Sequence, residues 1–455
     1  MPRLRPLEPS IAIREVDLTV PLSALTDVTG ATQTRIAVRA GARLLGHVTI
    51  QNGCRVISVN ELRDAIAAQV GEALLQRNEI EENVRDSFWN VLHEAIRVDD
   101  AESPAPVTLP AAVPVCVAVC TYDRPDDLAR CLTSLVDQAA TTARPVDLLV
   151  VDNHPASGLT APVVDAFPSV RYVAEERAGL AYARNAGFLA ARGAICVMTD
   201  DDVTFPPGWL EQLLAPFARH DVMVVTGNVL PGELDTEAQQ LFEIYGGLGR
   251  GTRRYVVDRS WLASYRRTAA PTWMLGATAN AAIRLSVFDD GAVSTMHEAL
   301  GPGTPTGVGE DTYLFYQILK AGYALVYEPS AFVWHRHRRT PEALKRQLYN
   351  YSKGHVAYHL VTLLEAGDVR AVVRCLKELP KAYVQRTVSR LRGHSAYPLR
   401  LLAVELAGTL AGPWALWRSY RRRRRLGPSR TRRDPGRSQP KVVSPKATAQ
   451  VSDPA

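Results

Sequence analysis

The chain has 455 residues, of which 46% are hydrophobic and 22% charged, as in an ordinary soluble protein long enough for two or three domains. Its formal net charge is +6, but the part from Arg418 onward holds twelve Lys or Arg and two Asp, which leaves residues 1–417 at −4. The basic excess therefore belongs to the tail, and the charge of the globular part excludes a nucleic-acid-binding domain.

The six cysteines are scattered through apolar runs without a paired CxxC spacing, so neither a zinc site nor a disulfide framework is expected. Met1 to Pro6 is not followed by the apolar stretch of a signal peptide. Both observations predict a reduced, cytoplasmic setting.

Residues 1–98 are expected to form a small accessory α+β domain, because short alternating runs are followed by amphipathic ones. No chemistry is recognisable in it. A linker rich in Pro, Ala and Ser follows at 99–112. The expected elements are strands 34–39 and 44–50, a helix from an N-cap at Asn60 to about Gln76, and a helix over 81–96.

From Val113 the pattern changes to alternating buried strands and helices, which predicts βαβ units and an α/β fold with a mainly parallel sheet flanked by helices. Functional side chains should then gather where the strands end. The catalytic domain is expected over 113–345. Its first elements are strands 114–120, 146–151 and 194–199 and helices 126–139 and 180–191.

Three consecutive carboxylates, Asp200, Asp201 and Asp202, end the third of these strands. Three adjacent like charges repel one another, so a bound cation is the simplest explanation. Oxygen ligands of this kind suit Mg²⁺ or Mn²⁺ and leave coordination positions free for substrate phosphates. The alternative is a solvated acidic turn.

Polar groups also end the other two strands, with Thr121, Tyr122 and Asp123 after the first and Asp152 after the second. Such residues often only cap loops, but three polar endings on parallel strands predict a cleft suited to a nucleotide. Arg184 and Asn185, on the helix that follows Gly179, could reach a diphosphate or could be ordinary surface groups.

The second half of this region begins with Trp273 and Gly276, in a stretch suited to face an acceptor. A Gly-, Pro- and Thr-rich loop at 301–309 precedes Glu310 and Asp311, which open a helix. The free amides and the dipole at a helix N-terminus keep a carboxylate ionised, so Asp311 could accept a proton. An ordinary capping role is the alternative.

An apolar strand over 324–334 ends in His335 and His337, which alternate onto one face. Neutral imidazole is a good third ligand for a divalent metal held by carboxylates, although most isolated histidines bind no metal.

Together these motifs resemble the family 2 glycosyltransferases of the GT-A fold, over roughly 113–339. The resemblance rests on the order of weak motifs: Val-Cys-Thr-Tyr-Asp-Arg-Pro, Val-Asp-Asn, Gly-Leu-Ala-Tyr-Ala-Arg-Asn-Ala-Gly, Asp-Asp-Asp, Gly-Glu-Asp and Glu-Pro-Ser-Ala-Phe-Val-Trp-His. Asp123 stands where Asn is common, and Asp152-Asn153-His154 replaces the usual acid-acid-Gly-Ser run.

The resemblance implies an inverting, metal-dependent transfer from a nucleotide-diphosphate sugar to a glycan, lipid-linked or small-molecule acceptor, as in cell-surface glycan synthesis. Asp311 would be the base. The other implied roles are donor binding by Thr121, Tyr122, Asp123, Asp152, Arg184, Asn185, Asp200 and Asp201; acceptor contact by Trp273, Gly276 and Glu310; and metal binding by Asp200, Asp202 and His335. A nucleotidyltransferase and a non-catalytic nucleotide-sugar-binding protein are the competing functions.

Residues 346–425 are expected to be helical. Leu401 to Trp417 is apolar but is interrupted by Glu405 and Pro413, and a run of Arg follows it at 421–425. This pattern suits either the anionic cytoplasmic face of a membrane or a packed terminal helix with a solvated basic tail. Residues 426–455 are expected to be disordered.

Overall fold

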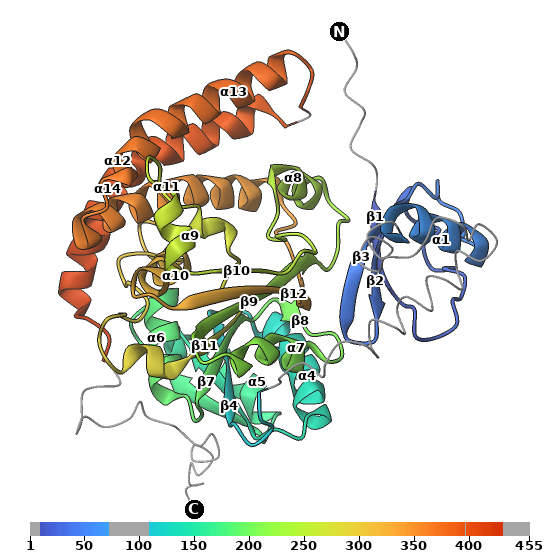
Figure 1. Ribbon diagram of the computed structural model, residues 1–455, viewed down its shortest axis with the longest axis horizontal. Helices are drawn as coiled ribbons and strands as arrows, with labels where there is room; N and C mark the ends of the chain where they lie inside the picture. The colour runs from blue at the N-terminus through green and yellow to red at the C-terminus, as the bar shows by residue number, and fades with distance from the viewer. Residues whose placement is uncertain (1–9, 72–108, 396, 431–455) are drawn as a thin grey trace, which may run out of the picture.

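The computed structural model describes residues 10–71, 109–395 and 397–430, which form a small N-terminal unit and a larger unit built on a nine-stranded sheet (Figure 1). The helix predicted at 81–96, most of the predicted linker and residues 431–455 of the predicted tail lie outside the described residues.

The N-terminal unit is a three-stranded sheet with one helix packed on it. Leu62 and Ile66 of the helix are buried with Ile36 and Val48 of the strands. Ser58 rather than Asn60 caps the helix, because the Ser58 hydroxyl accepts the N–H of Glu61. The elements, in the order β1-β2-β3, are β1 (Ile11–Asp17), β2 (Gln33–Ala40), β3 (Arg43–Ile50) and α1 (Val59–Ile66).

The N-terminal unit packs on the larger one through a small apolar cluster. Ala37 and Leu44 from the N-terminal sheet are buried together with Leu230 and Phe332 from the large sheet. The Leu44 N–H also donates to Ser330 Oγ at 3.4 Å. The two units are therefore in direct contact.

The large sheet has the order β10-β12-β9-β11-β7-β4-β5-β6, with β8 beside β12. Its strands are β4 (Val115–Thr121), β5 (Val146–Asp152), β6 (Val170–Ala174), β7 (Ile195–Asp200), β8 (Val203–Thr204), β9 (Val222–Pro231), β10 (Tyr255–Val257), β11 (Asn280–Arg284) and β12 (Ala324–His335).

Both faces of this sheet are covered, as the apolar strand sequences predict. In β4, Val115, Val117 and Val119 pack into one core cluster, whereas Cys116 and Ala118 pack into the other, which is the two-residue alternation of a strand. The helices between these strands are α4 (Pro125–Thr141), α5 (Ala161–Asp165), α6 (Leu180–Ala190), α7 (Trp209–Leu214), α8 (Glu237–Tyr245), α9 (Arg259–Ser264) and α10 (Glu310–Lys320). Of these, α8 packs with the C-terminal helices.

The predicted α/β fold is confirmed, and the sheet proves to be mixed. Strands β7, β4, β5 and β6 are parallel, but β11 runs antiparallel to both β7 and β9. The three predicted strands each end one residue later than expected, so that Thr121, Asp152 and Asp200 are still inside them. Strand β6 was not predicted.

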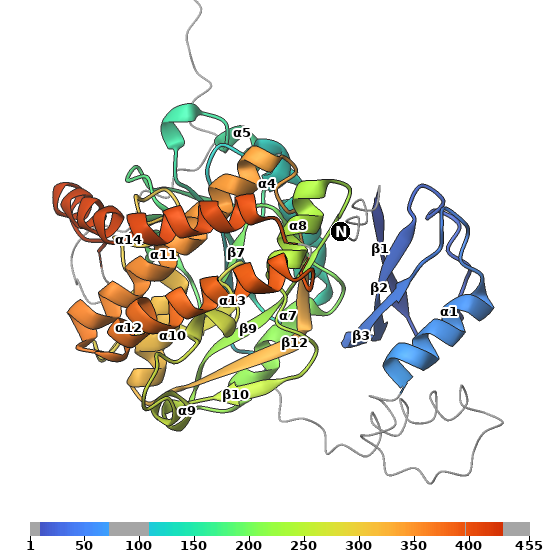
Figure 2. The ribbon, with the colours of Figure 1, turned by 90° about the horizontal axis from the view of Figure 1, so that it is seen from above.

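Four helices end the described chain: α11 (Pro341–Ala366), α12 (Arg370–Val373), α13 (Leu379–Leu391) and α14 (Leu399–Leu426). Figure 2 shows α13 and α14 running side by side across the larger unit. Gly408 and Gly412 let α14 approach α11 closely, since a Cβ at Gly408 would lie 2.4 Å from the Tyr349 carbonyl oxygen. By length and composition α14 could cross a membrane, and 39% of its most apolar stretch is buried in the protein.

Candidate active site

The polar ends of three adjacent strands meet at one edge of the sheet. Thr121 of β4 pairs with Asp152 of β5, and Cys120 pairs with Asp200 of β7. A cavity of about 1210 Å³ opens there, and residues from the sheet, from α10 and from the C-terminal helices line it. The predicted cleft at the strand ends is therefore present.

The three consecutive carboxylates point to different partners. Asp200 Oδ1 accepts from Arg184 Nη2 at 2.9 Å. Asp201 Oδ2 accepts from the Thr121 hydroxyl at 2.7 Å. Arg124 Nη1 donates to both Asp201 Oδ1 at 2.9 Å and Asp202 Oδ2 at 2.6 Å. Arg124 and Arg184 thus offset part of the negative charge of the three carboxylates. From the sequence alone, a bound cation was expected to do this.

Neighbouring charges separate the acidities of Asp201 and Asp202. Burial raises the pKa of Asp201 above its ordinary value, although Arg124 opposes the rise. Burial also acts on Asp202, but the charges of His335 and Arg124 outweigh it and hold the pKa of Asp202 below its ordinary value. Asp202 is therefore the carboxylate that stays ionised in this pair.

Asp202 and His335 face each other in a way that suits a metal ion. Asp202 Oδ1 is buried without a hydrogen-bond partner, and His335 Nε2 lies 3.2 Å from it. An oxygen and an imidazole nitrogen that converge like this fit a divalent metal such as Mn²⁺. In the described parts of the chain, no group of three or more His, Cys, Asp or Glu residues is close enough to form a complete set of ligands.

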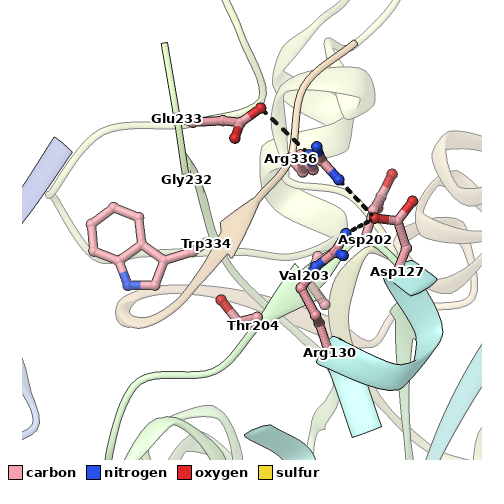
Figure 3. Close-up of a pocket in the computed structure, with 9 residues that line it drawn as sticks. All are labelled: Asp127, Arg130, Asp202, Val203, Thr204, Gly232, Glu233, Trp334 and Arg336. Carbon is pink, nitrogen blue, oxygen red and sulfur yellow. Dashed lines mark hydrogen bonds and ion pairs between the residues drawn. The ribbon is translucent and has the colours of Figure 1, made fainter. Parts of the chain in front are cut away.

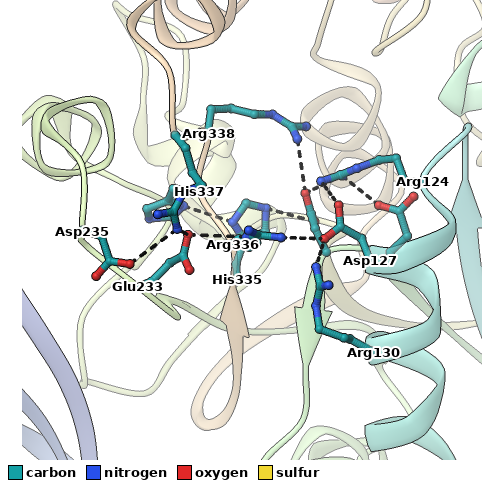
Figure 4. Close-up of polar contacts among 12 residues, drawn as sticks. Arg124, Asp127, Arg130, Glu233, Asp235, His335, Arg336, His337 and Arg338 are labelled. Carbon is teal, nitrogen blue, oxygen red and sulfur yellow. Dashed lines mark hydrogen bonds and ion pairs between the residues drawn. The ribbon is translucent and has the colours of Figure 1, made fainter.

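Arginines lie around Asp202 and His335, and Figure 4 shows Arg336 and Arg338 near His335. Arg338 Nη1 lies 3.7 Å from Asp202 Oδ2. Arg336 forms two ion pairs, from Nη1 to Asp127 Oδ1 at 3.3 Å and from Nε to Glu233 Oε1 at 3.4 Å. The main-chain N–H of Arg336 also donates to the main-chain carbonyl oxygen of Asp202 at 3.0 Å. The loop after β12 is therefore tied to the acidic run. A second cavity of about 400 Å³, lined by Arg130, Glu233, Trp334 and others, lies beside it (Figure 3).

Asp311 lines the large cavity at the second position of α10, after Gly309. Its Oδ2 accepts from the Thr278 N–H at 3.4 Å and its Oδ1 from the Thr312 N–H at 2.7 Å. Asp311 therefore lines the same cavity as Asp202 and His335, as the sequence predicted, and Gly309 is the capping residue.

Glu310 lines the same cavity at the first position of α10. It is 3% exposed, and its Oε1 accepts from Arg184 Nη1 at 2.6 Å. Burial and the charge of Asp311 raise the pKa of Glu310 although Arg184 opposes them. Because Arg184 also binds Asp200, these side chains join the start of α10 to the end of β7. Glu310 thus holds Arg184, and its predicted contact with an acceptor stays a prediction.

Three residues predicted to bind the donor, Asp123, Asp152 and Asn185, are not among those that line the cavity. Asp152 is buried and accepts from the Tyr172 hydroxyl at 2.8 Å and from the His154 N–H at 2.9 Å. The Asn185 amide donates to the Met296 carbonyl oxygen at 2.9 Å. The side chains of Asp152 and Asn185 hold neighbouring loops, and their predicted role in donor binding stays a prediction.

Sequence analysis missed a flat aromatic surface at the cavity mouth. Tyr122 is 48% exposed and stacks on His154, with ring centroids 4.9 Å apart. Asp123 Oδ2 lies 2.6 Å from His154 Nδ1. The backbone of Asp123 is in the left-handed conformation, with φ 54°. His154 was noted only as a departure from the family pattern, although its place after a strand end was a usable signal.

The far side of the cavity is formed by Trp273, Gly276 and the C-terminal helices. The Arg374 guanidinium lies 4.7 Å from the centre of the Trp273 ring. Gly276 has φ 120°, and a Cβ there would lie 2.5 Å from Thr226 Cβ, so only glycine fits. The lining from α8, α11, α13 and α14 includes Tyr245, Arg346, Tyr351, His355, Leu379, Tyr383, Glu405 and Thr409.

Comparison with known proteins gives one family. Residues 116–291 match the model of glycosyl transferase family 2. A pre-mycofactocin glycosyltransferase of Mycobacterium tuberculosis is 28% identical over 259 residues, which are 56% of this chain and 49% of that protein. A glucosyl-dolichyl phosphate glucuronosyltransferase of Haloferax volcanii is 28% identical over 123 residues, 26% of this chain and 38% of that protein. The match thus spans about half the length, or less, of these relatives.

Among solved structures, a mannosyltransferase from Pyrobaculum calidifontis in complex with GDP-Man and Mn²⁺ is similar. It is 17% identical with a TM-score of 0.43, and the match covers 76% of this chain and 98% of that one.

Proposed function

Since residues 116–291 match the model of glycosyl transferase family 2, we propose that the protein moves a sugar from a nucleotide-diphosphate donor to an acceptor hydroxyl with inversion at the anomeric carbon. The observation that carries this proposal is the common cavity of Asp202, His335 and Asp311. We assign the reaction to a catalytic domain over 113–345, with 1–98 as an accessory domain.

The donor side of the cavity is formed by Thr121, Tyr122, Arg184, Asp200 and Asp201, and Asp123 holds His154 beside Tyr122. The exposed Tyr122 ring offers a surface on which a base can stack. Arg184 is held by Asp200 and Glu310, so its guanidinium is fixed at the strand ends where a diphosphate is expected.

Asp200, Asp202 and His335 would hold the divalent metal. When bound, the metal supplies positive charge that stabilises the nucleoside diphosphate as it leaves. Asp311 accepts the proton of the acceptor hydroxyl. The acceptor oxygen then forms a bond to the anomeric carbon, while the bond from that carbon to the diphosphate oxygen breaks and its electron pair leaves with the nucleotide.

The acceptor is proposed to enter beside Trp273 and Gly276, where the cavity continues under α11, α13 and α14. The volume of about 1210 Å³ leaves room for a large acceptor, such as a glycan or a lipid-linked saccharide of cell-surface synthesis.

A membrane surface beside this entrance would suit such an acceptor. On α14, Glu405 and Thr409 line the cavity, whereas Leu406, Leu410, Trp414 and Trp417 are 45%, 74%, 60% and 53% exposed. This apolar stripe is followed by Arg421 to Arg425. The combination supports peripheral binding at an anionic cytoplasmic membrane face.

A direct test measures the product released from a panel of nucleotide sugars, with Mn²⁺ or Mg²⁺ and with EDTA. Release of nucleoside diphosphate only with metal supports the proposal. Release of pyrophosphate from a nucleoside triphosphate would instead identify a nucleotidyltransferase. Binding of a nucleotide sugar without turnover, with every acceptor that is offered, would identify a binding protein.

A further inference from the structure

A buried row of side chains lies behind His335. His335 Nδ1 is 3.0 Å from His337 Nδ1, and His337 Nε2 is 3.0 Å from Glu243 Oε1. His335 and His337 are 8% and 2% exposed. Figure 4 shows the two imidazoles next to each other at the end of β12. Glu243 belongs to α8, so the row crosses from one element to another.

The proton positions in this row follow from the chemistry of its ends. An ionised Glu243 only accepts hydrogen bonds, so His337 carries a proton on Nε2. A neutral His337 ring that carries its proton on Nε2 has a lone pair on Nδ1. His335 must then donate from Nδ1, because two lone pairs cannot bond to each other. Its Nε2 is thereby directed at Asp202 Oδ1, 3.2 Å away.

We propose that His337 and Glu243 are positioning residues that fix His335 with Nε2 directed at the metal site. The inference rests on the proposed function, since it assumes that Asp202 and His335 bind a divalent metal. Histidine ligands are commonly held in this way by a carboxylate or another acceptor on their second nitrogen, and losing that partner typically weakens metal binding about 10- to 100-fold.

The row also reaches the N-terminal unit. Arg35 Nη1 of β2 lies 3.5 Å from Glu243 Oε2, while the other oxygen of Glu243 serves His337. The packing around His337 is tight as well, because the ring meets Phe242 edge-on at 4.8 Å between centroids. The position of Glu243 is therefore set from two sides.

The test compares His337→Phe with His337→Asn in the full chain. Phenylalanine keeps a ring but removes the acceptor, whereas asparagine can place its amide oxygen near the position of Nδ1. With Mn²⁺ alone as the probe, the dissociation constant should rise about tenfold or more in the Phe variant and stay within about threefold in the Asn variant. Glu233→Gln is the control, because Glu233 contacts Arg336 of the same loop.

Nitrogen-15 chemical shifts of the His337 ring in the metal-free protein give a readout that does not depend on metal binding or on activity. They should show a proton on Nε2 and a bare Nδ1. The inference is overturned if His337 carries its proton on Nδ1, if His337→Phe binds Mn²⁺ like the wild type, or if His337→Asn is as weak as His337→Phe. If the wild type binds no Mn²⁺ but its His337 shifts are as expected, the proposed metal site fails, whereas the tautomer assignment holds.

Discussion

Asp311 is the residue on which the proposed chemistry depends most. In Asp311→Asn the amide has the same shape but cannot take up the acceptor proton, so turnover should fall about 10²- to 10⁴-fold. Donor affinity, measured by calorimetry with a nucleotide sugar and Mn²⁺, should stay nearly unchanged. Asp165→Asn, at an exposed position on α5, is the control. Retained turnover would remove Asp311 as the base.

The place of a residue at the end of an element could be predicted from the sequence, whereas the direction of its side chain could not: Asp152 ends β5 but bonds to Tyr172 and does not line the cavity. Asp202, His335 and Asp311 follow or begin apolar runs, and parallel strands bring such ends to one edge. Asn185 lies within α6, so its direction depends on how that helix rotates against the sheet. Arg124 was overlooked because its partners Asp201 and Asp202 are nearly eighty positions away.

At the scale of elements, Glu365 fastens α11 to α14. Its Oε1 lies 3.0 Å from His297 Nε2 and accepts from the Tyr420 hydroxyl of α14 at 2.7 Å. The hydrogen bond from His297 lowers the pKa of Glu365 to about 2, with Tyr420 adding to it against burial. A carboxyl whose pKa is lowered by folding stabilises the fold at every pH above its pKa in the unfolded chain. This stability is lost as the pH falls from about 5 towards 2.

Glu365→Gln should therefore lower the free energy of unfolding at pH 7, and the difference from wild type should shrink below about pH 5. Because the side chain of Glu365 is 37% exposed, solvent screening limits the loss to about 1 kcal/mol. Urea unfolding at several pH values measures it. Glu342→Gln on the exposed first turn of the same helix should show no such pH dependence. An equal deficit at pH 3 and pH 7 would contradict this account.

Strand β6 and the antiparallel direction of β11 are parts of the fold that could not be predicted from the sequence. Val170 to Ala174 is a short run that includes Arg171, and its strand character comes from pairing with β5. The direction of β11 is likewise set by its neighbours β7 and β9. Local periodicity identifies a buried segment, but it does not specify the partner strand or its direction.

On the scale of the whole molecule, the apolar stripe of α14 and the Arg run behind it predict binding to anionic vesicles. Arg418 and Arg421 lie over the rings of Trp414 and Trp417, at 4.7 and 4.8 Å from their centres. These cations therefore sit next to the rings that would enter the interface, where each basic residue contributes about 1 kcal/mol. The protein should float with vesicles that contain phosphatidylglycerol and much less with neutral ones.

The double variant Leu410→Glu and Trp414→Glu should remain at the bottom of the gradient, because two carboxylates oppose both insertion and the anionic surface. Both positions are more than half exposed, so the fold and turnover of a soluble acceptor should be retained. Val20→Glu alters a 57% exposed side chain of the N-terminal unit and should float like the wild type. If the double variant floats as well as the wild type, the exposed face of α14 does not bind the membrane.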